Sequence, residues 1–103
     1  MTEHHDMSTR TAQVVLDIGG EMGALVLYTG PERNGEEIEI CPAGHAGHRS
    51  HNQVHERQFN GRTWYAAVYP ELRAGEYELW NAGPLPADRV TIVGGQVAEL
   101  DWR

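Results

Sequence analysis

The sequence contains no lysine and only one cysteine, Cys41, and both scarcities limit what the protein can be. A single cysteine cannot form a disulfide within the chain, so packing alone must hold the fold. The eight basic residues are all arginines, scattered from Arg10 to Arg103, and the fifteen acidic residues leave a formal net charge of −7. That balance repels phosphate backbones and anionic lipids. We therefore expect neither a nucleic-acid nor a membrane partner.

Long apolar runs are missing too. Residues 1–10 are polar where a signal peptide needs an apolar stretch, and no later segment has the length to span a bilayer. These features predict a cytoplasmic protein. Residues 1–10 also lack apolar periodicity, which predicts a flexible polar tail. Residues 11–103 have the size of one domain with a single core.

Serine is scarce, and its two positions carry no hydrolase motif. Ser8 lies in the polar tail, and no Gly-x-Ser-x-Gly sequence surrounds Ser50. Gly19 and Gly20 do not begin a helix, so they form no phosphate-binding loop. No recognisable motif surrounds Cys41 that would make it a nucleophile. The sequence therefore predicts a non-enzymatic protein with no catalytic residues.

The sequence is rich in glycine, with twelve residues, and pairs such as Asn34-Gly35 and Gly94-Gly95 separate short apolar segments. Several segments alternate with period two, as Glu37-Ile38-Glu39-Ile40 does, and no window favours a helix as well. The pattern predicts an all-β fold, an antiparallel two-sheet β-sandwich of the Ig-like or prealbumin-like kind. Its roughly eight short strands are expected at 11–18, 24–29, 36–41, 51–59, 62–69, 75–80, 89–93 and 96–102.

The strongest turn signal is Asn60-Gly61, because these residues together tolerate the positive φ angles of a two-residue type I′ hairpin. Such a turn joins segment 51–59 to segment 62–69. Counting outward from it predicts the pairs Phe59 with Arg62, Arg57 with Trp64, His55 with Ala66 and Gln53 with Val68.

Two assignments of the buried face stay open at this point. In the first, the inward residues are Val54, Tyr65, Ala67 and Tyr69, because Val54 is the only aliphatic residue between Ser50 and Gln58. Trp64 then lies outside, beside Arg57 and His55. In the second, the core holds Phe59, Trp64, Ala66 and Val68, which is allowed because segment 62–69 is apolar on both faces.

Residues 69–80, with the pattern Leu-x-x-Gly-x-Tyr-x-Leu at 72–79, and the glycine-separated apolar pair at 90–102 resemble the closing strands of prealbumin-like and carboxypeptidase-regulatory-like domains. The resemblance covers the last third of the chain. It implies a tight turn at Gly75, a final hairpin, and a buried Tyr77 whose hydroxyl caps loop backbone. The whole chain also resembles short uncharacterised bacterial proteins. Prealbumin-like and carboxypeptidase-regulatory-like domains serve mostly as accessory or adhesive modules, so the likeness to them implies no specific activity.

Histidines and the single cysteine are concentrated in residues 41–55. Imidazole and thiolate are good ligands for zinc or copper, and four such groups suffice for a closed site. The candidates are His45, His48, His51 and Cys41. His51 and His55 on one strand would lie about 13 Å apart, so they cannot share an ion. The alternative is a polar surface loop that needs no cofactor.

A binding surface is the other hypothesis. If Trp64 lies outside with Arg57, His51 and His55, that face combines an aromatic ring, a cation and hydrogen-bonding groups, as interaction hot spots do. Alternatively, all three tryptophans belong to the core. We expect a binding or interaction module that recognises a protein partner or associates with itself as a homodimer, with Arg57, Trp64 and His55 as binding residues. Segment 51–59 is the expected edge strand, and its polar residues would either pair across a two-fold axis or prevent pairing.

Overall fold

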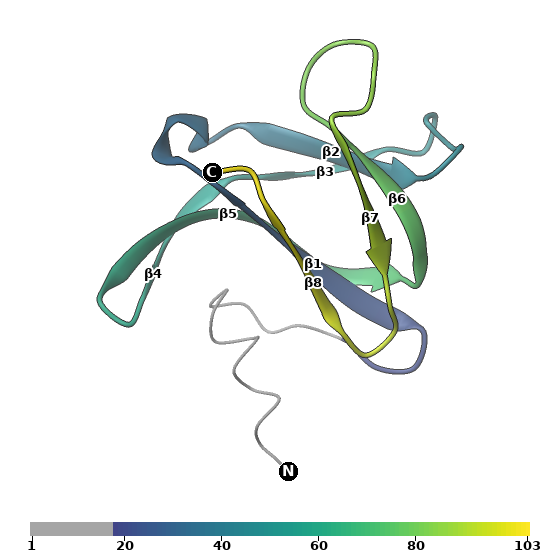
Figure 1. Ribbon diagram of the computed structural model, residues 1–103, viewed down its shortest axis with the longest axis horizontal. Helices are drawn as coiled ribbons and strands as arrows, with labels where there is room; N and C mark the ends of the chain where they lie inside the picture. Colours follow the sequence, from purple (N-terminus) through teal and green to yellow (C-terminus); the bar gives the residue numbers. More distant parts are fainter. Residues whose placement is uncertain (1–17) are drawn as a thin grey trace.

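The computed structural model describes residues 18–103, which form eight strands in two four-stranded sheets (Figure 1). Sheet A has the order β4 (His55–Phe59), β5 (Arg62–Arg73), β1 (Met22–Thr29) and β8 (Val97–Asp101). Sheet B has the order β3 (Ser50–Gln53), β2 (Glu37–Pro42), β6 (Gly75–Trp80) and β7 (Asp88–Ile92). A 3₁₀ turn, η1 (Pro31–Arg33), follows β1. The predicted all-β, two-sheet architecture is confirmed.

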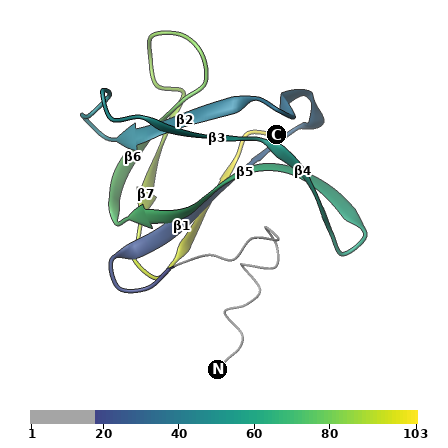
Figure 2. The same ribbon diagram turned by 180° about the vertical axis from the view of Figure 1, so that it is seen from behind.

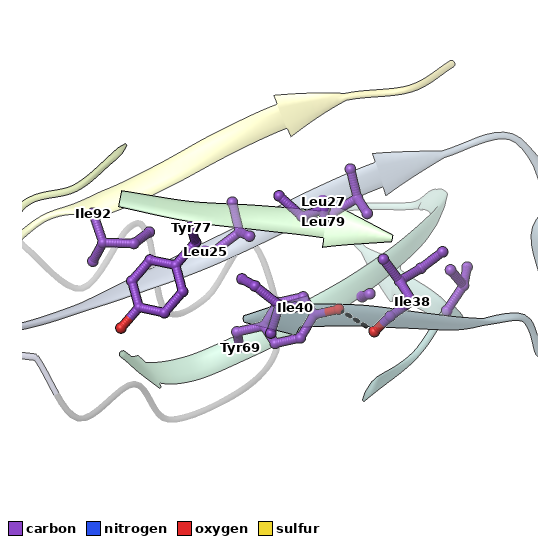
Figure 3. Close-up of a cluster of buried hydrophobic side chains, with 10 residues drawn as sticks. Leu25, Leu27, Ile38, Ile40, Tyr69, Tyr77, Leu79 and Ile92 are labelled. Carbon is purple, nitrogen blue, oxygen red and sulfur yellow. Dashed lines mark hydrogen bonds between the residues drawn. The ribbon is translucent and has the colours of Figure 1, made fainter. Parts of the chain in front are cut away.

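The main core lies between the two sheets, which Figures 1 and 2 show from opposite sides. Alternate residues of β1, β2, β5 and β6 enter it, as the pleat requires. We call it the inner cluster (Figure 3); its buried members are Leu25, Leu27, Ile38, Ile40, Val54, Ala67, Tyr69, Tyr77, Leu79 and Ile92. Each buried aliphatic side chain of this size contributes about 1.5–3 kcal/mol, so this cluster is the main stabilising feature of the fold.

Sheet A also buries apolar side chains on its opposite face. We call this second group the outer cluster; it comprises Ala24, Val26, Tyr28, Ala66 and Val68. They alternate with the inner-cluster residues of β1 and β5, so these two central strands are apolar on both faces. Three partly buried side chains pack against the outer cluster: Ile18, Trp64 and Val97.

The hairpin at Asn60-Gly61 is confirmed. Both residues have positive φ angles, 56° and 72°, as a type I′ turn needs. The predicted pairs Phe59 with Arg62, Arg57 with Trp64 and His55 with Ala66 are all present. The first face assignment holds, because Val54, Ala67 and Tyr69 belong to the inner cluster and Tyr65 packs against it.

The prediction of one continuous strand at 51–59 is wrong, because the chain passes from sheet B to sheet A at Val54. Gln53 pairs with Glu37 in sheet B instead of with Val68. The backbone N–H of Val54 donates to the Glu36 carbonyl at 2.9 Å, and its carbonyl accepts from the Gly35 N–H at 2.8 Å. These bonds fix the crossing while the Val54 side chain fills the inner cluster.

The prediction that both sheets are antiparallel is also wrong. Sheet B is antiparallel, but in sheet A β8 pairs with β1 in parallel. The expected final hairpin does not form, since β7 pairs with β6 and β8 lies in the other sheet. The chain instead crosses between sheets at Gly94-Gly95, packed tightly over the start of β1. A Cβ at Gly23 would lie 2.5 Å from the Val93 carbonyl oxygen, and one at Gly94 would overlap the Gly20 carbonyl.

The turn between β5 and β6 has the features that the family resemblance implies. Gly75 has a φ of +149°, which disfavours other residues. Tyr77 and Leu79 are buried in the inner cluster, and the Tyr77 hydroxyl donates to the Arg73 carbonyl at 2.7 Å. The predicted tail at 1–10, and the predicted strand at 11–18 apart from Ile18, lie outside the described residues. Within residues 18–103 there is no helical segment with the length and apolar character needed to cross a bilayer.

Candidate functional site

The structure brings the three predicted binding residues together on the outer side of sheet A. Arg57 on β4 lies opposite Trp64 on β5, and His55 lies opposite Ala66. The Arg57 Nε donates to the Ala66 carbonyl at 3.3 Å, and burial lowers the pKa of Arg57. His51 does not join them, because it lies on β3 in sheet B, opposite Glu39.

Trp64 forms one wall of a hollow at the end of sheet A. Its ring lies 5.5 Å from that of Tyr28, centroid to centroid, with a tilt of 53°. The guanidinium of Arg103 lies over both rings, 5.3 Å from the Tyr28 centroid and 5.6 Å from the Trp64 centroid. We call this hollow of about 280 Å³ the Trp64 cleft; it is lined by Tyr28, Thr29, Gly30, Pro31, Thr63, Trp64, Tyr65 and Arg103.

A second hollow, of about 290 Å³, adjoins the cleft and adds Arg62 to the lining. Arg103 is held by Asp101, which accepts from its Nε at 2.9 Å and from its Nη2 at 3.0 Å. These bonds lower the pKa of Asp101 to about 2, so the pair stays charged at neutral pH. Arg62 differs, since no acidic side chain among residues 18–103 lies within ion-pair distance of it.

The indole N–H of Trp64 is buried and has no acceptor within the part of the chain that the structure describes. The other two tryptophans are satisfied: Trp80 donates to the Cys41 Sγ at 3.4 Å and Trp102 to the Asp88 carboxylate at 2.9 Å. Leaving a buried donor unpaired costs about 1–3 kcal/mol. A donor left in that state beside a hollow marks a candidate binding site.

The polar groups of the cleft are the hydroxyls of its tyrosines and threonines and the Arg103 guanidinium. The Tyr28 hydroxyl donates to Glu99 at 3.2 Å, and burial together with the Glu99 charge raises the Tyr28 pKa to about 12, so this tyrosine is neutral. The lining residues include no serine, cysteine or histidine that would act as nucleophile or base. The cleft and the adjoining hollow together therefore offer the aromatic rings of Tyr28 and Trp64, the cations Arg62 and Arg103, and the indole N–H of Trp64.

The structure does not bring the predicted metal ligands together around one point. His45 and His48 lie near each other, with ring centroids 6.2 Å apart, but His51 faces Glu37 at 3.9 Å. Cys41 is 1% exposed and contacts the Trp80 indole. Between residues 18 and 103 no three His, Cys, Asp or Glu side chains are placed to hold one ion. A zinc or copper site stays a prediction.

Sequence reasoning found Trp64 and its neighbour Arg57 but missed Tyr28 and Arg103. Register counting from the Asn60-Gly61 turn places Arg57 beside Trp64, because these strands are neighbours in the chain. Tyr28 and Arg103 reach the cleft through the pairing of β1 with β5 and β8. No local pattern in the sequence signals that pairing, which joins residues more than 35 positions apart.

Comparison of the chain with protein-family models, with curated proteins and with solved structures finds no match. The likeness to prealbumin-like and carboxypeptidase-regulatory-like domains therefore stays a prediction. Function has to be argued from the geometry of the site itself.

Proposed function

We propose that the protein is a non-enzymatic binding module that takes a short acidic segment of a protein partner into the Trp64 cleft. One observation carries this proposal: the same hollow is lined by Trp64, whose buried indole N–H has no acceptor in residues 18–103, and by Arg62, which has no acidic partner in that range. Both groups are satisfied at once by a ligand that brings a carboxylate and a carbonyl oxygen.

The size of the cleft favours a protein segment over a free small molecule. Pockets for drug-sized molecules hold about 300–1,000 Å³, and this cleft, at about 280 Å³, lies just below that range. It suits one apolar side chain placed against the rings of Tyr28 and Trp64, which contact each other. The rest of the ligand would then lie along the rim, where Arg62 is well suited to bind a carboxylate through two parallel hydrogen bonds.

Arg103 has to turn aside for a ligand to reach the faces of the Tyr28 and Trp64 rings. Its guanidinium covers both rings, and the ion pair that holds it is exposed on both sides. Exposed ion pairs contribute little because water and salt screen them. A ligand group that packs on the two rings would replace the contacts that Arg103 gives up, so displacement of Arg103 is energetically feasible.

The net charge of −7 opposes an acidic ligand, and two of the carboxylates, Glu99 and Asp101, contact the cleft residues Tyr28 and Arg103. At physiological ionic strength the Debye length is about 8 Å, so distant carboxylates are screened while a contact with Arg62 is not. We expect binding to an acidic peptide to persist at physiological salt.

The proposal is tested by selecting random seven-residue peptides displayed on phage against the full chain. We expect enrichment of peptides that combine Asp or Glu with one large apolar residue. Their binding should fall at least tenfold in the Arg62→Gln variant and in Trp64→Phe, which keeps an aromatic ring but removes the indole N–H. Arg73→Gln removes an equally exposed arginine on β5, paired with Glu21, and serves as the control.

Three outcomes would overturn the proposal. The first is enrichment of basic peptides, and the second is equal binding by the wild type, Arg62→Gln and Trp64→Phe. The third is a concentration-dependent dimer, seen by light scattering, that Arg62→Gln abolishes, since a second copy of the chain would then occupy the cleft.

A further inference from the structure

The outer cluster forms an apolar surface on the side of sheet A that faces away from sheet B. Its members are at most 8% exposed. Among residues 18–103, the apolar side chains that pack against the cluster from outside it are Ile18, Trp64 and Val97. Three partly buried side chains form a small cover for a face that spans two central strands. We therefore asked which segment completes the cover.

The chain reaches this face at its first described residue. Ile18 packs against the outer cluster, and a tight turn follows it. In that turn the Gly19 N–H donates to the Met22 carbonyl and the Met22 N–H donates to the Gly19 carbonyl, both at 2.9 Å. This reciprocal pair reverses the chain direction just before β1. The chain at Ile18 therefore runs antiparallel to the start of β1.

The segment before Ile18 cannot join the sheet beside β1. One edge of β1 is paired with β5 over its whole length, and the other edge is paired with β8. The inner face of β1 is filled by the inner cluster. The outer face of sheet A is the remaining surface next to the turn.

The sequence of this segment fits such a surface. In an extended chain, side chains two residues apart share one face. Ala12, Val14 and Leu16 share a face with Ile18, and all four are apolar, whereas the other face carries Thr11, Gln13, Val15 and Asp17. At ~3.3 Å per residue, Ala12 to Ile18 spans ~20 Å, enough to cover the ~13 Å between Ala24 and Tyr28 on β1.

We propose that residues 11–17 lie extended across the outer face of sheet A, with Ala12, Val14 and Leu16 packed on the outer cluster. The interaction surface is the outer cluster, and its occupant is the N-terminal segment of the same chain. This inference does not depend on a ligand in the Trp64 cleft.

The neighbouring residues Leu16 and Val15 provide a matched test in the full chain. Leu16→Asn places a polar amide on the outer cluster, so we expect a lower urea midpoint and several-fold stronger fluorescence of a dye that binds exposed apolar surface. Val15→Asn makes a change of the same kind on the opposite face and should leave both readings at the wild-type value. Equal effects of the two variants, or no effect of Leu16→Asn, would overturn the proposal.

A direct measurement keeps the proposal testable even if Leu16→Asn fails to fold. In the wild-type chain, nuclear Overhauser contacts are expected from the methyl groups of Leu16 and Val14 to those of Val26 and Val68. Contacts from this segment only to β8 would show that it pairs with the edge of sheet A, and the proposal would fail. It would fail equally if an isotope-filtered experiment assigned the contacts to a second copy of the chain.

Discussion

At the scale of single residues, Tyr69 connects the two sheets. Its ring lies in the inner cluster and its hydroxyl donates to the Ile38 carbonyl of β2 at 2.6 Å (Figure 3). We expect Tyr69→Phe to lower the free energy of unfolding by about 1–3 kcal/mol, because the buried carbonyl loses this donor. Urea unfolding measures the change. Tyr65→Phe, on the same strand and against the same cluster, is the control and should cost less than half as much.

Buried tyrosines also predict how stability depends on pH. Burial raises the pKa of Tyr28 to about 12, and it raises the pKa values of Tyr69 and Tyr77 as well. A tyrosine in the unfolded chain ionises near pH ~10, so the protonated hydroxyls favour the folded state. Their contribution is complete below that pH and is lost as the pH rises toward about 12.

The measurement is a series of urea midpoints from neutral pH to pH ~11, with tyrosinate absorbance recorded in parallel. We expect the midpoint to fall above pH ~10 and the fall to be smaller in Tyr28→Phe. An unchanged midpoint while three tyrosines ionise would contradict the prediction.

At the scale of strands and turns, the crossing of β7 into β8 depends on close backbone packing. A Cβ at Gly23 would lie 2.5 Å from the Val93 carbonyl oxygen and 2.8 Å from Ile92. We expect Gly23→Ala to destabilise the protein by about 1–3 kcal/mol through overpacking. Gly47→Ala is the matched control, because the space around Gly47 is open and its φ is not positive. Thermal unfolding of both variants decides the matter; equal melting temperatures would count against a packed crossing.

The strands themselves were predictable because each is a short apolar or alternating segment between glycine-bearing turns. The register of the Asn60-Gly61 hairpin was predicted correctly from Phe59 back to His55, since a two-residue turn fixes the pairing of its neighbours. The passage between sheets at Val54 was not predicted. A period-two pattern indicates which face of a strand a side chain occupies, but it does not indicate to which sheet that strand belongs. The Gly94-Gly95 turn was misjudged for the same reason: two glycines permit a hairpin and a crossing equally well.

The candidate site was predictable only where it is local. Trp64 and Arg57 follow from counting along one hairpin. Tyr28 and Arg103 come from distant strands, and the unpaired indole N–H of Trp64 is a property of packing. Such a property appears only when neighbouring side chains are placed in space.

At the scale of the whole molecule, charge sets a prediction for self-association. The formal net charge is −7 at pH 7 and the isoelectric point of the sequence is about 5.2, so the net negative charge decreases between these two pH values. Repulsion between molecules therefore weakens as the pH falls from 7. We expect the second virial coefficient, measured by static light scattering, to decrease steadily toward pH ~5 and solubility to reach its minimum there. A coefficient independent of pH would show that short-range contacts dominate.

The chain changes sheets after β1, β3, β5 and β7. In sequence order β1 belongs to sheet A, β2 and β3 to B, β4 and β5 to A, β6 and β7 to B, and β8 to A (Figures 1 and 2). No contiguous fragment shorter than residues 22–101 therefore contains the whole of sheet A. Each pair of strands gains its stability only when the opposite sheet is present to complete the inner cluster.

The parallel pair of β1 and β8 has a consequence for synthesis on the ribosome. Residues 22–29 lie in the middle of sheet A, yet their neighbour at 97–101 is translated about 70 residues later. At about 5–20 residues per second, the nascent chain waits roughly 4–14 s with one edge of its central strand bare. An open apolar strand edge is a template for pairing with other chains. The nascent chain is thus most vulnerable to misassembly in the seconds before β8 is released, when a chaperone would protect it most.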